Sequence, residues 1–299
     1  MKKSVSMLLA ALMLTGALAG CGSSASTSDS RATDGADSGV SGAITVISRE
    51  DGSGTRGAFI ELTGVEEKTA DGKKVDNTTA DAEIANKTDV VLTSVAGNEK
   101  AIGYISLGAL NDTVKAVKVD GAEATVDNVK AGAYKLSRPF NIATKGEPTG
   151  LAKDFINFIL SKEGQAVVTD NKYIAVNDAA GSFVSDGSSG QIAVGGSSSV
   201  SPVMEKLIEA YKSVNPNASI DLQTSDSTSG MTGAMDGTFA IGMASRELKD
   251  EEAAQLTGTA IALDGIAVIV NPANTIDELS MDQIKSIYVG DITDWGDLA

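Results

Sequence analysis

Apolar and polar positions along this chain form three kinds of segment: short apolar runs, turns of small polar residues, and amphipathic stretches. Residues 43–48, 191–194 and 261–270 are apolar runs rich in β-branched side chains, as expected of buried strands. Residues 281–288 and the segment that starts at Ser201 repeat apolar side chains three and four positions apart, the spacing of one helix face. The repeated order of strand, turn and helix predicts an α/β fold.

Weaker signals of the same kind complete this prediction. Residues 149–168 have the apolar spacing of a helix, with a break at Glu163-Gly164. Residues 179–190 are rich in Gly and Ser and are expected to form a linker. The further expected strands are 89–95, 101–107, 113–119, 219–223 and 239–244.

The N-terminal residues have the order of an export signal. Two lysines precede an apolar run, residues 7–18, that is too short to span a bilayer permanently. The run ends in Leu18-Ala19-Gly20-Cys21, which resembles the lipobox of bacterial lipoproteins, in which the cysteine is lipidated and becomes the mature N-terminus. We therefore expect a signal peptide over 1–20 and a lipid anchor on Cys21, which places the protein on the extracytoplasmic face of the cell membrane.

The residues after the cysteine form the predicted tether. Residues 22–42 are mostly Ser, Thr, Gly, Asp and Ala, with almost no bulky apolar side chain. Such a segment cannot bury enough apolar surface to offset the entropy of ordering it. We expect a flexible connection between the lipid anchor and a folded body.

Length and composition restrict the class of protein. With 299 residues and a hydrophobic fraction of 42%, the chain is long enough for two domains with apolar cores. It has no His and one Cys, which excludes Ser-His-Asp and Cys-His catalysis, histidine metal ligands and a disulfide framework. Its net charge of −16 makes nucleic acid an unsuitable partner, because binding phosphates along a strand needs a basic face. We expect no catalytic residue, no metal site and no cofactor.

Four turns have Ser or Thr where an expected strand is followed by a helix; they are residues 49–55, 197–201, 225–229 and 244–246. A helix N-terminus carries unpaired backbone N–H groups and the positive end of the helix dipole. Hydroxyl groups at the same place add donors, so such turns suit a small anion without a net positive charge. The alternative is that these residues are ordinary helix caps.

The turn Arg49-Glu50-Asp51-Gly52-Ser53-Gly54-Thr55 carries the most specific set of groups. Arg49 is a natural bidentate partner for an oxyanion, while Ser53 and Thr55 offer hydroxyls and Gly54 a backbone N–H. Asp51 is expected to orient the Arg49 guanidinium. The alternative is an Arg–Asp ion pair on the surface, which contributes little to the stability of the fold. The segment lacks the Lys of a P-loop and the Gly-x-Ser-x-Gly of a nucleophile elbow.

Residues 47–59 resemble the signature of phosphate-binding proteins of ABC phosphate importers, and Gly196-Ser197-Ser198-Ser199-Val200-Ser201-Pro202 resembles the first anion-binding turn of that family. The resemblance covers about 44–178 and 191–299. It implies a two-lobed, type II periplasmic-binding-protein-like fold, with two hinge strands and the ligand in the cleft between the lobes. Further segments that match are 103–108, 138–140, 241–249, 264–271 and 292–295.

The segments follow an order different from that of the family. There, the Gly-Ser-Thr-Ser turn comes near the start, and Ile-Thr-x-Trp leads directly into the Arg-x-Asp-Gly-Ser-Gly-Thr segment; here the chain ends on Ile292-Thr293-Asp294-Trp295. We interpret this as a circular permutation, with 179–190 joining the former termini; the alternative is a fragment of a tandem pair. The expected divisions are 43–137 and 267–299 for lobe two, 141–263 for lobe one, and crossings at 134–140 and 263–270.

The resemblance also implies the site residues. Ser198, Ser199 and Ser227 match donors of one lobe, and Arg49, Ser53, Gly54 and Thr55 match donors of the other. Ser245 stands where some members have an Asp that accepts the proton of hydrogen phosphate. A buried acceptor left unpaired disfavours sulfate, so the missing Asp matters for selectivity. Asp51 and Asp226 are the substitute candidates for this acceptor.

The implied function is that of a solute-binding lipoprotein, which captures inorganic phosphate by cleft closure and delivers it to the permease and ATPase subunits of an ABC importer. Alternatives are another tetrahedral oxyanion (sulfate, molybdate or tungstate) and a surface or sensor role without transport. A hydrolase with Ser53 or Ser198 as nucleophile would need Lys or metal-bound carboxylates, and no Asp/Glu cluster with metal-ligand spacing supports one.

Overall fold

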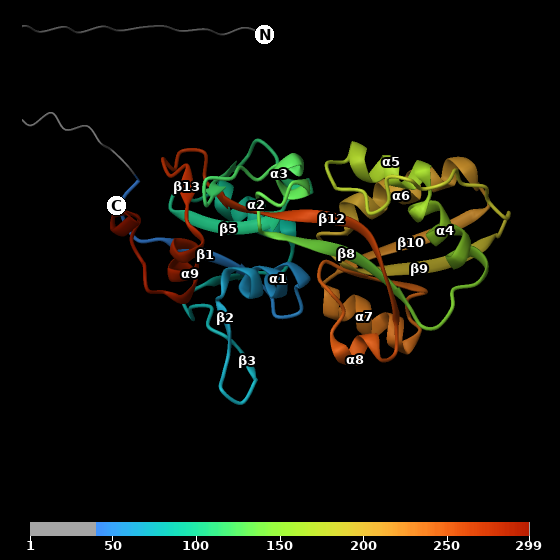
Figure 1. The fold of residues 1–299 in the computed structure, drawn as a ribbon, viewed down its shortest axis with the longest axis horizontal. Coiled ribbons are helices and arrows are strands. Elements are labelled where there is room, and N and C mark those ends of the chain that lie inside the picture. Colours follow the sequence, from blue (N-terminus) through green and yellow to red (C-terminus); the bar gives the residue numbers. More distant parts are fainter. Residues whose placement is uncertain (1–39, 299) are drawn as a thin grey trace, which may run out of the picture. The chain divides into compact units, whose positions relative to one another are not determined.

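The computed structural model describes residues 40–298, which form the body of the chain (Figure 1). The expected signal peptide, Cys21 and all but the last residues of the expected tether lie outside the described residues. Within residues 40–298, no helix combines the length and the apolar character needed to cross a membrane.

The body is built on one continuous path of paired strands, in the order β10-β9-β11-β8-β12-β5-β1-β4, with β6 also paired to β12. Strands β9, β10 and β11 are mutually parallel at one end, and β1, β4 and β5 are parallel at the other. The strands are β1 (Thr45–Arg49), β4 (Glu83–Ala85), β5 (Ala101–Ser106), β6 (Lys115–Ala116), β8 (Ser137–Thr144), β9 (Gly190–Ser197), β10 (Ala218–Ser225), β11 (Ile241–Ala244) and β12 (Thr257–Val270).

Strands β8 and β12 connect the two ends of this path. They pair antiparallel from Thr257↔Thr144 to Gly265↔Ser137, and the far end of β12 pairs with β5. In Figure 1 they run from one group of elements to the other. The chain therefore passes from one end to the other along β8 and returns along β12, as hinge strands do.

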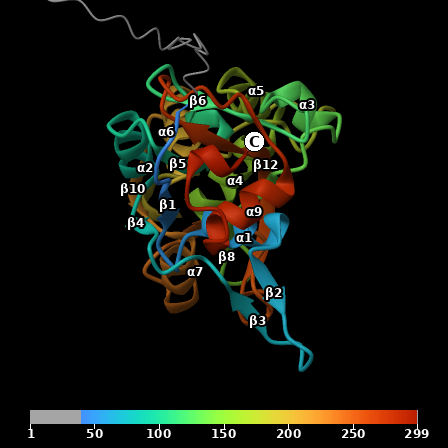
Figure 2. The same ribbon diagram turned by 90° about the vertical axis from the view of Figure 1, so that its left-hand side faces the viewer.

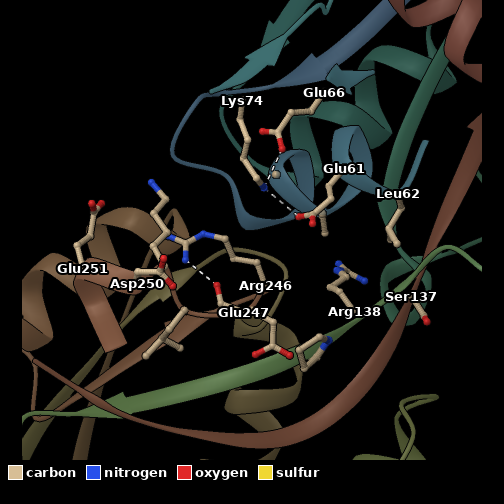
Figure 3. Close-up of a pocket in the computed structure, with 15 residues that line it drawn as sticks. Glu61, Leu62, Glu66, Lys74, Ser137, Arg138, Arg246, Glu247, Asp250 and Glu251 are labelled. Carbon is tan, nitrogen blue, oxygen red and sulfur yellow. Dashed lines mark hydrogen bonds and ion pairs between the residues drawn. The ribbon is translucent and has the colours of Figure 1, made fainter. Parts of the chain in front are cut away.

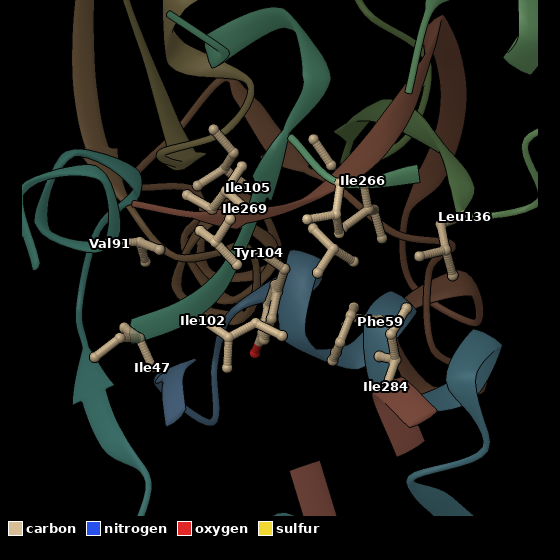
Figure 4. Close-up of a cluster of buried hydrophobic side chains, with 14 of the residues drawn as sticks. Ile47, Phe59, Val91, Ile102, Tyr104, Ile105, Leu136, Ile266, Ile269 and Ile284 are labelled. Carbon is tan, nitrogen blue, oxygen red and sulfur yellow. The ribbon is translucent and has the colours of Figure 1, made fainter. Parts of the chain in front are cut away.

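The buried hydrophobic side chains form two main clusters. One takes its residues from 46–136, Ile174 and 266–295 (Figure 4), and we call the part of the body around it lobe two. The other takes its residues from 140–262 and defines lobe one. In lobe two, Phe59 stacks on Tyr104 with ring centroids 3.9 Å apart, which fixes helix α1 (Gly54–Thr63) against the sheet.

The remaining elements cover these cores. In both views the hairpin of β2 and β3 projects from lobe two (Figure 2). Lobe two also holds β2 (Glu66–Lys68), β3 (Lys74–Asp76), α2 (Thr88–Ala96), η1 (Leu107–Ala109), β7 (Lys118–Val119), α3 (Val126–Lys130), β13 (Glu278–Leu279), α9 (Met281–Val289) and η2 (Trp295–Leu298). Lobe one holds α4 (Gly150–Leu160), α5 (Lys162–Asp170), α6 (Ser201–Val214), α7 (Ser227–Asp236) and α8 (Asp250–Ala253).

The structure differs from the sequence-based elements in three places. Residues 89–95, expected to be a strand, lie in helix α2, where Val91, Leu92 and Val95 are buried on one face. The expected strand 113–119 is divided into β6 and β7. The break in the helix over 149–168 falls at Ser161, because its hydroxyl accepts from the N–H of Gly164 and caps α5.

Candidate anion-binding site

Polar side chains gather where strands of the two lobes end. The parallel strands β9, β10 and β11 carry Ser197–Ser199, Ser227 and Ser245 just beyond or at their carboxyl ends. Strand β1 of lobe two ends at Arg49, and its turn leads into α1. Because carboxyl ends of parallel strands meet at one edge of a sheet, the three turns of lobe one lie together, and the turn after β1 contacts them from lobe two.

Arg49 is buried, with 2% of its surface exposed, and its guanidinium contacts three groups. Its Nη2 donates to Ser198 Oγ of lobe one at 3.1 Å, and its Nε to the carbonyl of Ala85 at 3.2 Å. Glu50 accepts from Nε and from Nη2, both at 2.8 Å, so that the carboxylate holds the guanidinium plane by two bonds. The charge of Arg49 is thus buried, paired and directed toward lobe one.

The expectation that Asp51 orients Arg49 is wrong. Asp51 forms an ion pair with Arg56 at 2.5 Å, and its side chain is 97% exposed. After β1 the chain turns, so that Asp51 points out to solvent while Glu50 stays beside the guanidinium. The same exposure also removes Asp51 as an acceptor for a proton in the cleft.

The start of helix α1 lies directly against lobe one. Ser53 is the helix cap, since its Oγ accepts from the N–H of Arg56. Gly54 is the first helical residue, and a Cβ there would overlap with the hydroxyl of Ser227 and lie 2.8 Å from that of Ser245. The missing side chain at Gly54 lets the helix N-terminus approach the opposite lobe closely.

Hydroxyl groups of both lobes meet at this point. Thr55 Oγ1 lies 2.8 Å from Ser199 Oγ and 3.3 Å from Ser245 Oγ, across the boundary between the lobes. Ser245 uses its backbone N–H to donate to Ser227 Oγ at 3.1 Å, and its own Oγ accepts from Ser197 at 3.0 Å. We define the hydroxyl cluster as Thr55, Ser198, Ser199, Ser227 and Ser245, all of which are buried.

Two further residues, to which sequence analysis assigned no role, contact this cluster. Thr88 Oγ1 lies 3.4 Å from Ser198 Oγ and 3.3 Å from Ser199 Oγ. It opens helix α2, and it was missed because the residues after it were expected to be a strand. Arg138 donates from Nη2 to Thr55 Oγ1 at 3.2 Å and forms a buried ion pair with Asp264. Burial raises the pKa of the Asp264 carboxyl, against the opposite effect of Arg138.

Asp226, the other expected proton acceptor, is a helix cap. Its carboxylate accepts from the N–H of Ser229 at 2.9 Å and from the hydroxyl of Ser229 at 2.5 Å, at the start of α7. Beside it, Thr228 donates its N–H to the carbonyl of Gly52 in lobe two at 3.2 Å. Asp226 therefore lies at an interlobe contact, with its carboxylate oxygens already occupied as a cap.

Known proteins resemble this chain over almost its whole length. The model of the PBP superfamily domain matches residues 26–163 and 182–299. The chain is 50% identical to phosphate-binding protein PstS 2 of Streptococcus agalactiae over 99% of this chain and 98% of that protein. It is 48% identical to phosphate-binding protein PstS 2 of Streptococcus pneumoniae over 99% of both. The chain belongs to the PstS family of phosphate-binding proteins.

A solved structure agrees with this assignment to the PstS family. The crystal structure of a phosphate ABC transporter, phosphate-binding protein from Streptococcus pneumoniae matches with a TM-score of 0.69 and 50% identity, over 86% of this chain and 100% of that one. The resemblance to phosphate-binding proteins and the periplasmic-binding-protein-like fold are thus confirmed. As a PstS family member the chain is a binding protein and not an enzyme.

A groove opens beside the hydroxyl cluster of this PstS family member. It has a volume of about 710 Å³ and is lined by α1 and the β2–β3 hairpin on one side, by residues 246–251 on the other, and by 137–139 of β8 at its base. Figure 3 shows Glu61, Glu66 and Lys74 on one side, with Asp250 and Glu251 opposite them. Both lobes therefore line the groove, and its width depends on how closely they approach.

The groups around the cluster are mainly donors. The N-termini of α1, α2 and α7 lie beside it, and so do the guanidinium groups of Arg49 and Arg138. In a chain with a net charge of −16, such local donors are what attracts an anion. Among the residues that the structure describes, no group of three or more Asp, Glu, His or Cys is arranged to hold a metal ion.

Proposed function

We propose that this chain captures inorganic phosphate at the hydroxyl cluster and delivers it to the permease of an ABC importer. One observation carries the proposal: buried donors of both lobes, located at the ends of strands or at the starts of the helices that follow them, converge on one point. Lobe two contributes Arg49, Gly54 and Thr55, and lobe one contributes serines at three separate turns. The names of the relatives that are 50% and 48% identical support phosphate as the ligand.

Phosphate suits this set of groups chemically. Its oxygens point to four corners and accept several hydrogen bonds each, while hydroxyls, guanidinium N–H groups and backbone N–H groups all donate. In the structure the hydroxyls contact one another, for example Thr55 with Ser199 at 2.8 Å. An oxyanion between them would exchange these neutral hydrogen bonds for charge-assisted bonds, which are about twice as strong.

Binding is coupled to closure, because neither lobe alone carries the full set of donors. Arg49 reaches Ser198, and Thr55 reaches Ser199 and Ser245, only while the lobes are together. An anion that contacts both sets stabilises the closed form over the open one and shifts the population toward it. Strands β8 and β12 are the connection about which this motion takes place.

Other tetrahedral oxyanions remain the second candidate for a specific reason. Ser245 stands where some family members have the Asp that accepts the proton of hydrogen phosphate, and its Oγ already accepts a hydrogen bond from Ser197. Asp51 faces solvent and Asp226 caps α7. Sulfate, which carries no proton at neutral pH, would suit a site made of donors as well as phosphate does.

We also propose that the protein is held at the membrane by a lipid on Cys21. The support is the sequence alone: an apolar run ends in Leu18-Ala19-Gly20-Cys21, and a polar segment follows. An anchored binding protein stays close to its permease, which raises the local concentration of the loaded protein.

The test is calorimetric titration of the purified chain without its predicted signal peptide, with phosphate and with sulfate, at acidic and alkaline pH. We expect phosphate to bind, and sulfate binding that is much weaker than phosphate binding would favour phosphate over the second candidate. Equal binding of both anions would indicate that the site binds tetrahedral oxyanions in general and is not specific for phosphate. A folded protein that binds neither would overturn the transport function.

A further inference from the structure

Arg138 lies behind the hydroxyl cluster and donates to it. It is 3% exposed and sits in hinge strand β8, and its Nη2 is 3.2 Å from Thr55 Oγ1. We infer that Arg138 is a positioning residue for the anion site, which holds the Thr55 hydroxyl so that its proton faces the cleft. This inference rests on the proposed function, since it specifies how one donor of that site is prepared.

The guanidinium of Arg138 is fixed independently of the cleft. Its Nη1 contacts the Asp264 carboxylate and donates to the carbonyl of Gly265 at 2.7 Å. Arg138 and Asp264 are direct cross-strand partners in β8 and β12. Its Cζ also lies 5.0 Å from the centre of the Phe140 ring. Two hinge strands and an aromatic ring thus determine where Nη2 points.

The direction of the hydrogen bond follows from the chemistry of the two groups. A guanidinium carries only donors, so Thr55 Oγ1 must accept from Arg138. The single hydroxyl proton of Thr55 then points elsewhere, and the nearest other oxygens are those of Ser199 and Ser245 in the cluster. Thr55 therefore presents a donor to the cleft, as an oxyanion requires.

Arg49 and Ser198 repeat this arrangement from the other side. Arg49 is also paired with a carboxylate, that of Glu50, and its Nη2 donates to Ser198 Oγ at 3.1 Å. The two arrangements differ in one respect: the Arg49–Ser198 bond crosses between the lobes, whereas Arg138 and Thr55 are joined through the hinge and lobe two. Arg138 can therefore orient Thr55 before the cleft closes.

The test is a double-mutant cycle of Arg138→Lys and Thr55→Val, with phosphate affinity measured by calorimetry. Lysine keeps the charge beside Asp264, but its single nitrogen cannot occupy the positions of Nη1, which bonds Asp264 and Gly265, and of Nη2, which bonds Thr55. We expect each single variant to bind phosphate about tenfold more weakly, the effect of one lost hydrogen bond to a charged group. In the Thr55→Val background, Arg138→Lys is expected to cause no further loss.

Tyr134→Phe is the matched control. The Tyr134 hydroxyl is buried near the same hinge and donates to the carbonyl of Ile266 at 2.8 Å, but it does not contact the cluster. We expect it to lower the melting temperature while phosphate affinity stays within about twofold, because a buried hydrogen bond is lost without a change at the site.

Two results would overturn the inference: unchanged affinity in Arg138→Lys, or a loss that persists in full when Thr55 is already Val. If Arg138→Lys does not fold, the double variant Arg138→Gln with Asp264→Asn, which removes both charges, replaces it in the cycle. The same two results, measured with this variant, would overturn the inference. Failure of the proposed function is a separate result, since then the parent chain itself would not bind phosphate.

Discussion

Gly52 of lobe two lies against the carboxylate of Asp226 in lobe one. A Cβ on Gly52 would overlap with both the carboxyl carbon and Oδ1 of Asp226. Next to this contact, the N–H of Thr228 donates to the carbonyl of Gly52 at 3.2 Å. The absence of a side chain at Gly52 therefore lets the two lobes meet while the Asp226 carboxylate keeps its position as the cap of α7.

We predict that Gly52→Ala weakens phosphate binding by about 1–3 kcal/mol, the usual cost of inserting a methyl group into a packed contact. The closed form is the one that loses stability, so affinity falls while the melting temperature of the protein without ligand changes little. Calorimetry and thermal unfolding measure the two quantities.

Gly57→Ala is the control for this change. Gly57 lies in helix α1, which follows the turn that contains Gly52, and a Cβ there would have its nearest neighbour, Arg246 Cδ, at 3.8 Å. Alanine at this position favours the helix and should leave phosphate affinity unchanged. Relief of the Gly52→Ala defect by Asp226→Ser, which keeps a helix cap but is shorter, would identify the carboxylate as the cause. Normal affinity in Gly52→Ala would contradict this account of closure.

The Arg49 guanidinium gives a second prediction. Arg49→Ala should weaken phosphate binding by about 2–5 kcal/mol, as truncation of one partner of a buried charge pair does. Glu50→Gln should weaken binding to a smaller extent, because the amide holds the guanidinium by weaker bonds. Asp51→Asn should have no effect, since Asp51 pairs with Arg56 in solvent. A larger loss of affinity in Asp51→Asn than in Glu50→Gln would indicate that Asp51, and not Glu50, holds the Arg49 guanidinium.

The third prediction concerns the pH dependence of stability and follows from the buried carboxyl group of Asp154. It is 1% exposed and accepts from the hydroxyls of Tyr211 at 2.6 Å and Ser185 at 2.7 Å, and from the N–H of Asp186 at 2.9 Å. Burial alone would raise the pKa of Asp154, but the hydrogen bonds from these three residues, with that of Asn215, lower it below its ordinary value.

Because the folded-state pKa of Asp154 is below the unfolded-state value, the unfolded chain binds the proton more tightly in acid. The contribution of Asp154 to stability is therefore present above about pH 4 and is lost as the pH falls through the folded-state pKa. Asp154→Asn should lower the melting temperature at neutral pH and flatten its decrease in acid. Thermal unfolding between pH 2 and pH 7 measures this, and an unchanged slope would count against it.

The lipid anchor gives the fourth prediction. Cys21→Ser removes the only thiol that can carry a lipid. The protein should then move from the membrane fraction to the soluble fraction of cells, while its phosphate affinity stays the same. Detergent phase partitioning separates the two forms, and a variant that remains in the membrane fraction would disprove anchoring through Cys21.

Sequence reasoning reached the family, the fold class and the residues of the hydroxyl cluster, because turns such as 49–55 contain their donors within a few consecutive positions. It did not reach Glu50, because the choice between neighbouring carboxylates depends on the direction in which each side chain leaves the turn. It missed Thr88 because the β-branched residues at 89–95 favour a strand locally, so no helix was expected to begin at Thr88. In the structure these residues form a helix that buries Val91 and Val95.

Arg138 shows another limit of the sequence. Its motif with Pro139 and Phe140 was visible, but its role depends on the register of β8 and β12, which pairs it with Asp264 across a long separation in the chain. No local pattern reports such pairing. The circular permutation and the lobe boundaries based on it stay predictions.

The path of the chain through β8 and β12 also sets an order of assembly. Between these strands, residues of lobe one follow one another, with Ile174 alone packed in the core of lobe two, so its parallel strands and helices can pair with neighbours close in sequence. In lobe two, strand β5 pairs with the far end of β12, which lies near the opposite end of the chain. Closing so long a loop is slow. We expect lobe one to fold first and lobe two to stay open along the edge of β5 until β12 pairs with it.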